Sequence, residues 1–238
     1  MDQKTIVDAF TIMAPDYENL VDKELSAFWG WRYQDFMNLV VGMSEIYEKD
    51  RVLDIATGTA VIPFTINQLK PGSRSIHGLD ITLSMLQKAK QKLATAISQI
   101  NLELTCASGV HLPYRSGSFD FVICGLATHH MEVPGLLAEI ARVTRPKGRI
   151  TLADVGGVPL WKWPVINTLI RAAAFIYFLP GHGFARAWSE GAALSNVRTA
   201  QEWGELLKAY DFTGIKITKL QTAHFWSPDA LVLQAQKL

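Results

Sequence analysis

The chain has 238 residues, of which 49% are hydrophobic and 19% charged, and its formal net charge is +1. This length suits one domain with a sizeable core, and the apolar content excludes a disordered chain. The near-zero net charge argues against a nucleic-acid-binding protein, which would carry a basic stripe. Cys106 and Cys124 give neither a disulfide framework nor a zinc-binding spacing, so we expect a reduced, cytoplasmic environment and no metal.

Residues 14–48 have a helical pattern, with apolar side chains near the 3.6-residue period and a break at Gly30 and Trp31. Between residues 51 and 155 the pattern changes to short apolar strands that alternate with helices. This alternation is typical of βαβ units and predicts an α/β, Rossmann-like fold, with helices on both faces of a mostly parallel sheet. The expected strands are 51–55, 73–80, 102–107, 118–125 and 149–153, and the expected helices are 60–69, 82–97 and 133–143.

The C-terminal part of the chain departs from this alternation. We expect helices over 159–177 and 199–210, and two strands, 212–220 and 224–235, that pair antiparallel at the edge of the sheet. We expect residues 156–198 to form a lid over the carboxyl ends of the parallel strands, where ligands of such sheets bind. Prolines and charges interrupt the apolar stretch 158–180, which is therefore expected not to span a membrane. A single domain is expected, with four parts: a helical cover (1–49), a core (50–155), the lid (156–198) and a C-terminal helix with edge strands (199–238).

The segment Val52-Leu-Asp-Ile-Ala-Thr-Gly-Thr-Ala60 joins an apolar strand to a helix through a turn of small residues. Small residues let the backbone approach a ligand, and the helix offers free N–H groups at its start. A dinucleotide site needs three glycines here, whereas this turn has only Gly58 and carries Asp54 where a pyrophosphate would lie. The turn therefore favours a ligand with a positive group, such as an amino acid moiety.

Asp80 ends the second strand of the core. A carboxylate at this place can accept hydrogen bonds from both hydroxyls of a ribose. The alternative is a charge that stabilises the start of the following helix, for which Thr82 is a plausible cap. Asp54 and Gly58 upstream favour the ribose.

Together these motifs resemble a known family. The set comprises Val52–Ala60, Asp80, Leu112-Pro113 before Ser118-Phe-Asp120, and Arg142-Val-Thr-Arg-Pro-Lys-Gly148. It is similar to the class I S-adenosylmethionine (SAM)-dependent methyltransferases, and in particular to the ubiquinone/menaquinone methyltransferase subgroup. The resemblance covers residues 50–155, with Ala14-Pro-Asp-Tyr17 in addition, and it implies a seven-stranded, mostly parallel sheet whose last strand is antiparallel.

The resemblance also implies SAM as the cofactor and a role for each matching residue. The methionine part would lie against Ala56, Thr57, Gly58 and Ala60, with Asp54 close to its amino group. The nucleoside would contact Asp80 at the ribose and Ile81, Met85, Ser108 and Gly109 at the adenine. Gly125 and Leu126 would pass beneath the sulfonium, and Tyr17 would close over the cofactor. Two positions depart from the family pattern: Ala60 replaces a glycine, which is costly only if its φ is positive, and Ser108 replaces an aspartate.

Three residues near the expected edge are candidates for the catalytic base. His129 and His130 follow the fourth strand, and Asp154 ends the fifth. Histidine is the usual base near neutral pH, although one of the pair could instead bond the next helix. His182 is a weaker candidate within the lid, and the remaining histidines, His77, His111 and His224, are expected to be structural or exposed.

The lid segment is rich in aromatic residues, namely Trp161, Trp163, Phe175, Tyr177, Phe178, Phe184 and Trp188. Such residues are often core, but here they favour a pocket for an aromatic or lipophilic substrate, part of which could rest on a membrane. We expect methyl transfer to a carbon or oxygen of a hydrophobic small molecule. The alternatives are a SAM-assisted cyclisation or rearrangement without methyl transfer, and a non-catalytic SAM-binding protein.

Overall fold

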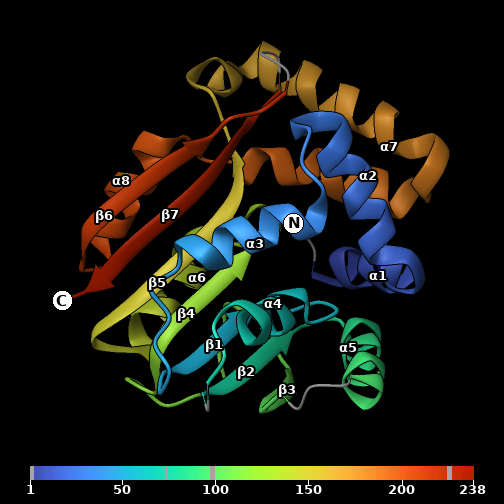
Figure 1. Ribbon diagram of the computed structural model, residues 1–238. Helices are drawn as coiled ribbons and strands as arrows, with labels where there is room; N and C mark the ends of the chain where they lie inside the picture. The colour runs from blue at the N-terminus through green and yellow to red at the C-terminus, as the bar shows by residue number, and fades with distance from the viewer. Residues whose placement is uncertain (1–2, 73, 97–99, 224–226) are drawn as a thin grey trace.

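The computed structural model describes residues 3–72, 74–96, 100–223 and 227–238, which form one seven-stranded sheet flanked by helices (Figure 1). The strand order across the sheet is β3-β2-β1-β4-β5-β7-β6. The strands are β1 (Arg51–Ile55), β2 (Ser75–Asp80), β3 (Leu102–Cys106), β4 (Phe119–Gly125), β5 (Thr144–Gly156), β6 (Phe212–Leu220) and β7 (Asp229–Lys237). β1 lies between β2 and β4, because the chain leaves it first toward β2 and then returns to pair β4 on its other side.

The first five strands are parallel, and β7 pairs antiparallel with both β5 and β6. This confirms the predicted α/β, Rossmann-like class. The predicted antiparallel pairing of the last two strands is also correct, but β7 is inserted between β5 and β6 and only β6 forms the edge. β7 begins at Asp229, and residues 224–226 of the predicted strand, including His224, lie outside the described part of the chain.

Helices pack on both faces of the sheet and bury two apolar clusters (Figure 1). One cluster joins the sheet to α6 (Val133–Val143) and α8 (Ala200–Ala209). The other joins it to α2 (Tyr17–Trp29), α3 (Tyr33–Met43) and α4 (Val61–Leu69). Strands covered on both sides are mostly apolar, which is why β4 shows an unbroken apolar run from Phe121 to Cys124 rather than alternation.

The N-terminal region contains one more helix than the sequence pattern predicted. α2 and α3 confirm the helical reading of residues 14–48, and Gly30 separates them with a left-handed φ of 74°. The additional helix, α1 (Gln3–Met13), precedes them. Its apolar residues Ile6, Phe10 and Met13 recur at the spacing of one helical face, which is the signal that the prediction left unused.

The carboxyl ends of the parallel strands point toward α1, α2 and α7 (Pro164–Ala193) (Figure 1). α7 is interrupted at Gly183, whose φ of 77° and ψ of 169° are not helical. The helix α5 (Leu83–Thr95) follows β2 at the same edge. None of the helices in the described residues is long and apolar enough to cross a membrane.

Candidate active site

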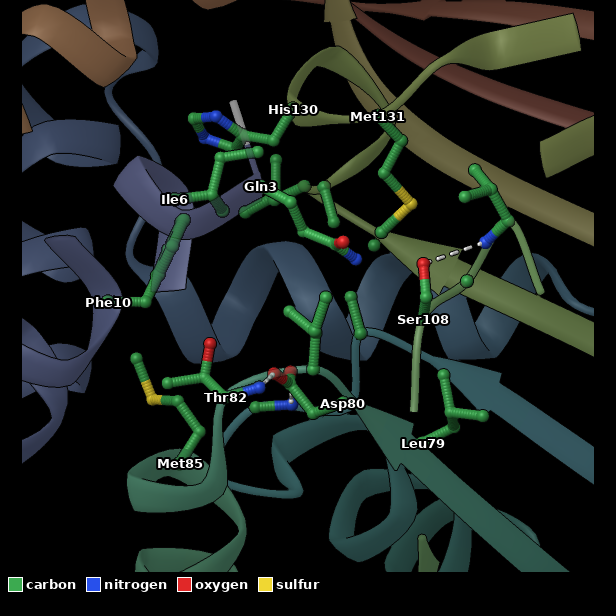
Figure 2. A pocket seen from close by; sticks show the side chains of 18 of the residues that line it. Gln3, Ile6, Phe10, Leu79, Asp80, Thr82, Met85, Ser108, His130 and Met131 are labelled. Carbon is green, nitrogen blue, oxygen red and sulfur yellow. Dashed lines mark hydrogen bonds between the residues drawn. The ribbon is translucent and has the colours of Figure 1, made fainter. Parts of the chain in front are cut away.

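A cleft of about 260 Å³ opens at the carboxyl ends of β1, β2 and β4, and α1 covers it (Figure 2). Ten of the thirteen predicted cofactor residues line it: Tyr17, Ala56, Gly58, Asp80, Ile81, Met85, Ser108, Gly109, Gly125 and Leu126. The other three, Asp54, Thr57 and Ala60, are buried outside its lining. The strand-end rule thus located the cleft correctly, because successive parallel strands bring distant turns to one edge.

Asp80 is held in the cleft by two backbone groups. Its Oδ2 accepts a hydrogen bond from the Gly58 N–H at 2.9 Å, and its Oδ1 accepts one from the Thr82 N–H at 2.8 Å. Burial raises the pKa of the carboxyl, while these hydrogen bonds favour its ionised form. Each oxygen retains a second lone pair for a ligand hydroxyl. Asp80 therefore fixes the Gly58 turn and can also accept hydrogen bonds from a ribose.

Asp54 lies beneath the turn with 0% of its surface exposed, and neither carboxylate oxygen has a hydrogen-bond partner in the described structure. Burial raises the pKa of Asp54 to about 8, the nearby Thr57 hydroxyl opposes this rise, and the charge of Asp80 adds a smaller contribution to it. Such a carboxyl is mostly protonated at neutral pH, and a cation placed beside it would favour its ionised form. The ammonium group of the methionine moiety is such a cation, so the residues present fit SAM even though Asp54 is not on the surface of the cleft.

The turn between β1 and α4 is backbone-strained. Ala56, Gly58 and Ala60 have φ values of 56°, 54° and 64°, all in the left-handed region. This conformation costs an alanine roughly 1–2 kcal/mol, whereas glycine adopts it freely. Ala60 therefore does not have the negative φ at which alanine in place of glycine would cost little. Ala56, with its positive φ, carries the same strain.

We expect Ala60→Gly to raise the free energy of unfolding by up to about 1 kcal/mol, which corresponds to a rise in Tm of roughly 2–4 °C. Glycine relieves the left-handed strain, and its greater freedom in the unfolded chain offsets part of this gain. Differential scanning calorimetry measures the change. Ala89→Gly is the matched control, because Ala89 is also buried but lies inside α5, where glycine should cost about 1 kcal/mol. Equal losses in both variants would contradict the strain at Ala60.

The cleft also contains residues that the sequence analysis did not identify. Gln3, Ile6 and Phe10 of α1 face Asp80 from across the cleft, and Met131 lies above Ser108 (Figure 2). Gly109 is closely packed here, since a Cβ at this position would lie 3.0 Å from Ile55 Cγ2 and 3.1 Å from the Met131 sulfur. Ser108 Oγ accepts a long hydrogen bond of 3.4 Å from the Val110 N–H, so a neutral hydroxyl stands where the family has a carboxylate.

A second cavity of about 590 Å³ adjoins the cleft and is enclosed mainly by α2 and α7. We call it the chamber. It shares Phe10, Tyr17, Leu126 and His130 with the cleft, so the two spaces meet at these four side chains. Most of its lining is apolar: Met13, Val21, Leu25, Phe28, Trp29, Val155, Trp161, Ile170, Ala173, Ala174, Tyr177, Phe178, Ala193, Leu194, Val197 and Pro228.

The lid aromatics divide between the chamber and the outside of the molecule. Trp161, Tyr177 and Phe178 line the chamber, as expected for a hydrophobic pocket. Trp163, Phe184 and Trp188 are exposed instead, and Phe175 packs against Phe184 with ring centroids 5.6 Å apart. The aromatic composition of this segment therefore has two structural origins, and only part of it concerns the chamber.

His129 and Asp154 form a hydrogen-bonded pair in the wall of the chamber. His129 Nδ1 lies 2.6 Å from Asp154 Oδ1. Asp154 also accepts hydrogen bonds from the Thr128 hydroxyl and from the backbone N–H groups of His129 and Val155. Burial opposes the charge of each partner, but their mutual attraction outweighs it, so the pKa of His129 is raised and that of Asp154 is lowered. Asp154 is thus a fixed anion that orients His129.

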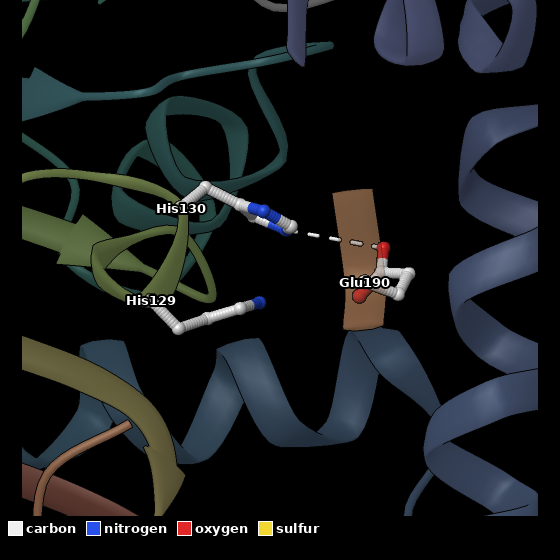
Figure 3. Close-up of side chains that lie close together, drawn as sticks. All are labelled: His129, His130 and Glu190. Atoms are coloured by element: carbon white, nitrogen blue, oxygen red, sulfur yellow. Dashed lines mark ion pairs between the residues drawn. The ribbon is translucent and has the colours of Figure 1, made fainter. Parts of the chain in front are cut away.

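His130 is also buried but has the opposite electrostatics. Burial, and then the charge of His129, hold the pKa of His130 well below its usual value. Its Nδ1 has no hydrogen-bond partner in the described structure, and its Nε2 is 3.9 Å from Glu190 Oε1. Both histidine rings point toward Glu190 of α7 (Figure 3). His130 is therefore a neutral group at the junction of cleft and chamber.

Glu190 belongs to a buried ionic cluster that the sequence analysis missed. Arg186 Nη2 lies 2.5 Å from Glu24 Oε1 of α2, and Arg186 Nε lies 3.8 Å from Glu190 Oε1. His129, His130 and Glu190 offer ligand atoms within 4.8 Å of one another, which is the composition of a metal site. The Arg186 guanidinium, however, already supplies a positive charge beside Glu190, and we interpret the cluster as an ion network that links α2 to α7. No local motif marks it, because its members are 162 residues apart.

The other histidines have no role in the chamber that the structure describes. His77 packs edge-on against Tyr114 and Phe119 and is structural, as expected. His111 is exposed at the rim of the cleft. The side chain of His182 lies outside the described part of the structure.

Comparison with known proteins identifies the enzyme class. The methyltransferase domain family matches residues 53–152. A demethylmenaquinone methyltransferase from Lactobacillus johnsonii is 27% identical over 232 residues, covering 92% of this chain and 88% of the relative. The ubiquinone/menaquinone biosynthesis C-methyltransferase UbiE from Citrifermentans bemidjiense is 29% identical over 181 residues, covering 74% and 73% of the two chains.

Solved structures of methyltransferases have a similar fold. A SAM-dependent methyltransferase from Methanosarcina mazei matches with a TM-score of 0.58 and 20% identity, covering 81% of this chain and 94% of that one. The chain is a SAM-dependent methyltransferase, and S-adenosylmethionine is its cofactor.

Proposed function

We propose that this methyltransferase transfers a methyl group to a carbon or oxygen of a hydrophobic, ring-bearing small molecule that occupies the chamber. The observation that carries the proposal is the junction of an apolar cavity of about 590 Å³ with the cofactor cleft. A pocket of this size and lining suits a small lipophilic ligand whose orientation is set by a few polar groups. The two relatives, a demethylmenaquinone methyltransferase and a ubiquinone/menaquinone biosynthesis C-methyltransferase, support a quinone-like acceptor.

The cleft residues supply binding and orientation. Asp80 would accept hydrogen bonds from the ribose, Ile81 and Met85 would contact the adenine, and the backbone at Gly58 would lie against the methionine part. When bound, the cofactor supplies a methyl group on a positively charged sulfur. Tyr17 and Leu126 line both cavities, so they would contact both ligands where the reacting atoms meet.

The wall of the chamber supplies a base. Since His129 Nδ1 faces Asp154, its Nε2 is the nitrogen that can receive a proton from a ligand hydroxyl. Loss of that proton makes a phenol or enol electron-rich at oxygen and at the neighbouring ring carbon. Either of these atoms could then accept the methyl group that the bound cofactor would supply, while His129 holds the proton taken from the ligand hydroxyl. If the ring carbon is methylated, that carbon would release its proton to solvent and His129 would return its proton to the ring oxygen, which restores the aromatic phenol.

The test is a turnover assay with SAM and a short-chain hydroquinone acceptor, analysed by mass spectrometry. We expect a product heavier by one methylene unit and an equal amount of S-adenosylhomocysteine. The control omits SAM and supplies S-adenosylhomocysteine instead. A product of unchanged mass would favour the cyclisation or rearrangement alternative. Binding of S-adenosylhomocysteine without turnover of any ring-bearing acceptor would favour the non-catalytic alternative.

A further inference from the structure

The first half of α7 has an apolar stripe on the outside of the molecule. Val165, Leu169, Ile176 and Leu179 are spaced by four, seven and three residues, so they share one face of the helix. Between 41% and 71% of each is exposed. We call these four residues the outer face of α7.

The opposite side of the same helix lines the chamber, through Ile170, Ala173, Ala174, Tyr177 and Phe178. α7 is therefore apolar on two opposite faces, only one of which is covered by protein. A helix with apolar residues all round normally lies inside a protein or in contact with lipid. The outer face thus lacks the polar surface that water would favour.

Exposed apolar side chains are concentrated in this region. Among the described residues, nine of the fourteen large hydrophobic side chains that are exposed fall between 160 and 188. Besides the outer face and Tyr177, they are Leu160, Trp163, Phe184 and Trp188. A concentration of this kind marks an interaction surface rather than the scattered exposure found on most proteins.

All the charged side chains of residues 155–189 are positive. This segment contains no aspartate or glutamate, although the chain has 22 of them, and it includes Lys162, Arg171 and Arg186. Arg171 and Lys162 lie toward the surface, where Lys162 Nζ also pairs with Glu202 Oε1 at 3.1 Å, while Arg186 is buried. Basic residues beside exposed aromatic and aliphatic side chains suit an interface with anionic headgroups, into which the apolar side chains insert.

We propose that the outer face of α7 docks on a lipid bilayer that carries anionic headgroups, so that the chamber opens toward the lipid. Tyr177 lines the chamber and is also 54% exposed, which places one edge of the chamber beside the docking surface. A second copy of the chain is disfavoured as the occupant, because a symmetric contact would bring like-charged segments together. Docking itself is independent of the proposed function, whereas delivery of a lipophilic acceptor from the bilayer rests on it.

The test measures binding of the full chain to vesicles by flotation. The probes are vesicles of phosphatidylcholine alone and of phosphatidylcholine with an equal amount of phosphatidylglycerol. We expect the protein to float with the anionic vesicles. The triple variant Val165→Gln, Leu169→Gln, Ile176→Gln should bind them at least about tenfold more weakly.

The matched control replaces three exposed leucines elsewhere, Leu69→Gln, Leu83→Gln and Leu238→Gln, and should bind the vesicles like the unaltered protein. Light scattering without lipid reports on self-association. The proposal is overturned if the protein does not float, if both triple variants bind equally, or if the outer face instead supports a dimer. Turnover of a soluble short-chain acceptor by the outer-face variant should equal that of the unaltered protein. If neither turns it over, the proposed function fails while the vesicle result stands.

Discussion

Replacing Asp80 with alanine is expected to weaken binding of S-adenosylhomocysteine at least 100-fold. In the structure Asp80 ties the Gly58 and Thr82 backbone to the floor of the cleft and keeps lone pairs for a ligand. A hydrogen bond to a charged group contributes about 1.5–3 kcal/mol, so two ribose hydroxyls account for about 3–6 kcal/mol. Isothermal titration calorimetry measures the loss directly.

The matched control is Glu103→Gln, which removes an acid from the neighbouring strand β3 without touching the cleft. Its affinity for S-adenosylhomocysteine should be unchanged. Thermal unfolding of Asp80→Ala separates a lost ligand contact from a collapsed turn, because only the latter lowers Tm markedly. Affinity within threefold of the unaltered protein would show that Asp80 only stabilises the start of α5, the alternative that the sequence left open.

The position of the cofactor cleft was predictable because its signals are local. A carboxylate or small residue directly after a parallel strand must lie at the carboxyl edge of the sheet, and this rule places Asp80, Ser108 and Gly125 correctly. The backbone conformation of Ala60 was not predictable in the same way. Whether its φ is positive depends on how α4 packs on the sheet, and a side chain alone does not report that packing.

The cover of the cleft was harder to predict, because it is built by long-range packing. α1 supplies Phe10, yet nothing in residues 3–13 specifies which strand end this helix will cover. The pair formed by Arg186 and Glu24 bridges α7 and α2 and has no sequence spacing of its own. The lid aromatics show the same limit: composition indicated an apolar surface, but only helix phase in the fold separates Phe178 in the chamber from Trp163 outside.

The second prediction with a large expected effect concerns His129, the proposed general base. We expect His129→Gln to lower kcat by about 10²–10⁴-fold, the usual contribution of a general base, with little change in affinity for S-adenosylhomocysteine. His129 lies in the wall of the chamber and not in the lining of the cleft, so its loss should spare the cofactor. His130→Gln is the matched control for removal of a neighbouring imidazole. Equal kcat in the His129 variant and the unaltered enzyme would contradict the assignment.

The pH dependence of kcat distinguishes a base from a structural residue. A base acts when it is neutral, so the rate should rise with pH through the pKa of His129, which Asp154 raises above the ordinary value near 6.5. Asp154→Asn removes the negative charge and leaves burial as the main influence, which lowers the pKa of His129. The acidic limb of the profile should therefore move to lower pH, while the plateau falls because the imidazole is a weaker base.

His130→Gln should leave the acidic limb near its original place or at slightly higher pH, because His130 stays neutral well below the range in which His129 titrates. Combining His129→Gln with Asp154→Asn should reduce kcat little more than His129→Gln alone, since Asp154 acts through His129. Additive losses in the double variant would instead assign Asp154 an independent role. A limb that stays in place in Asp154→Asn would exclude His129 as the group whose proton is removed before the methyl group moves.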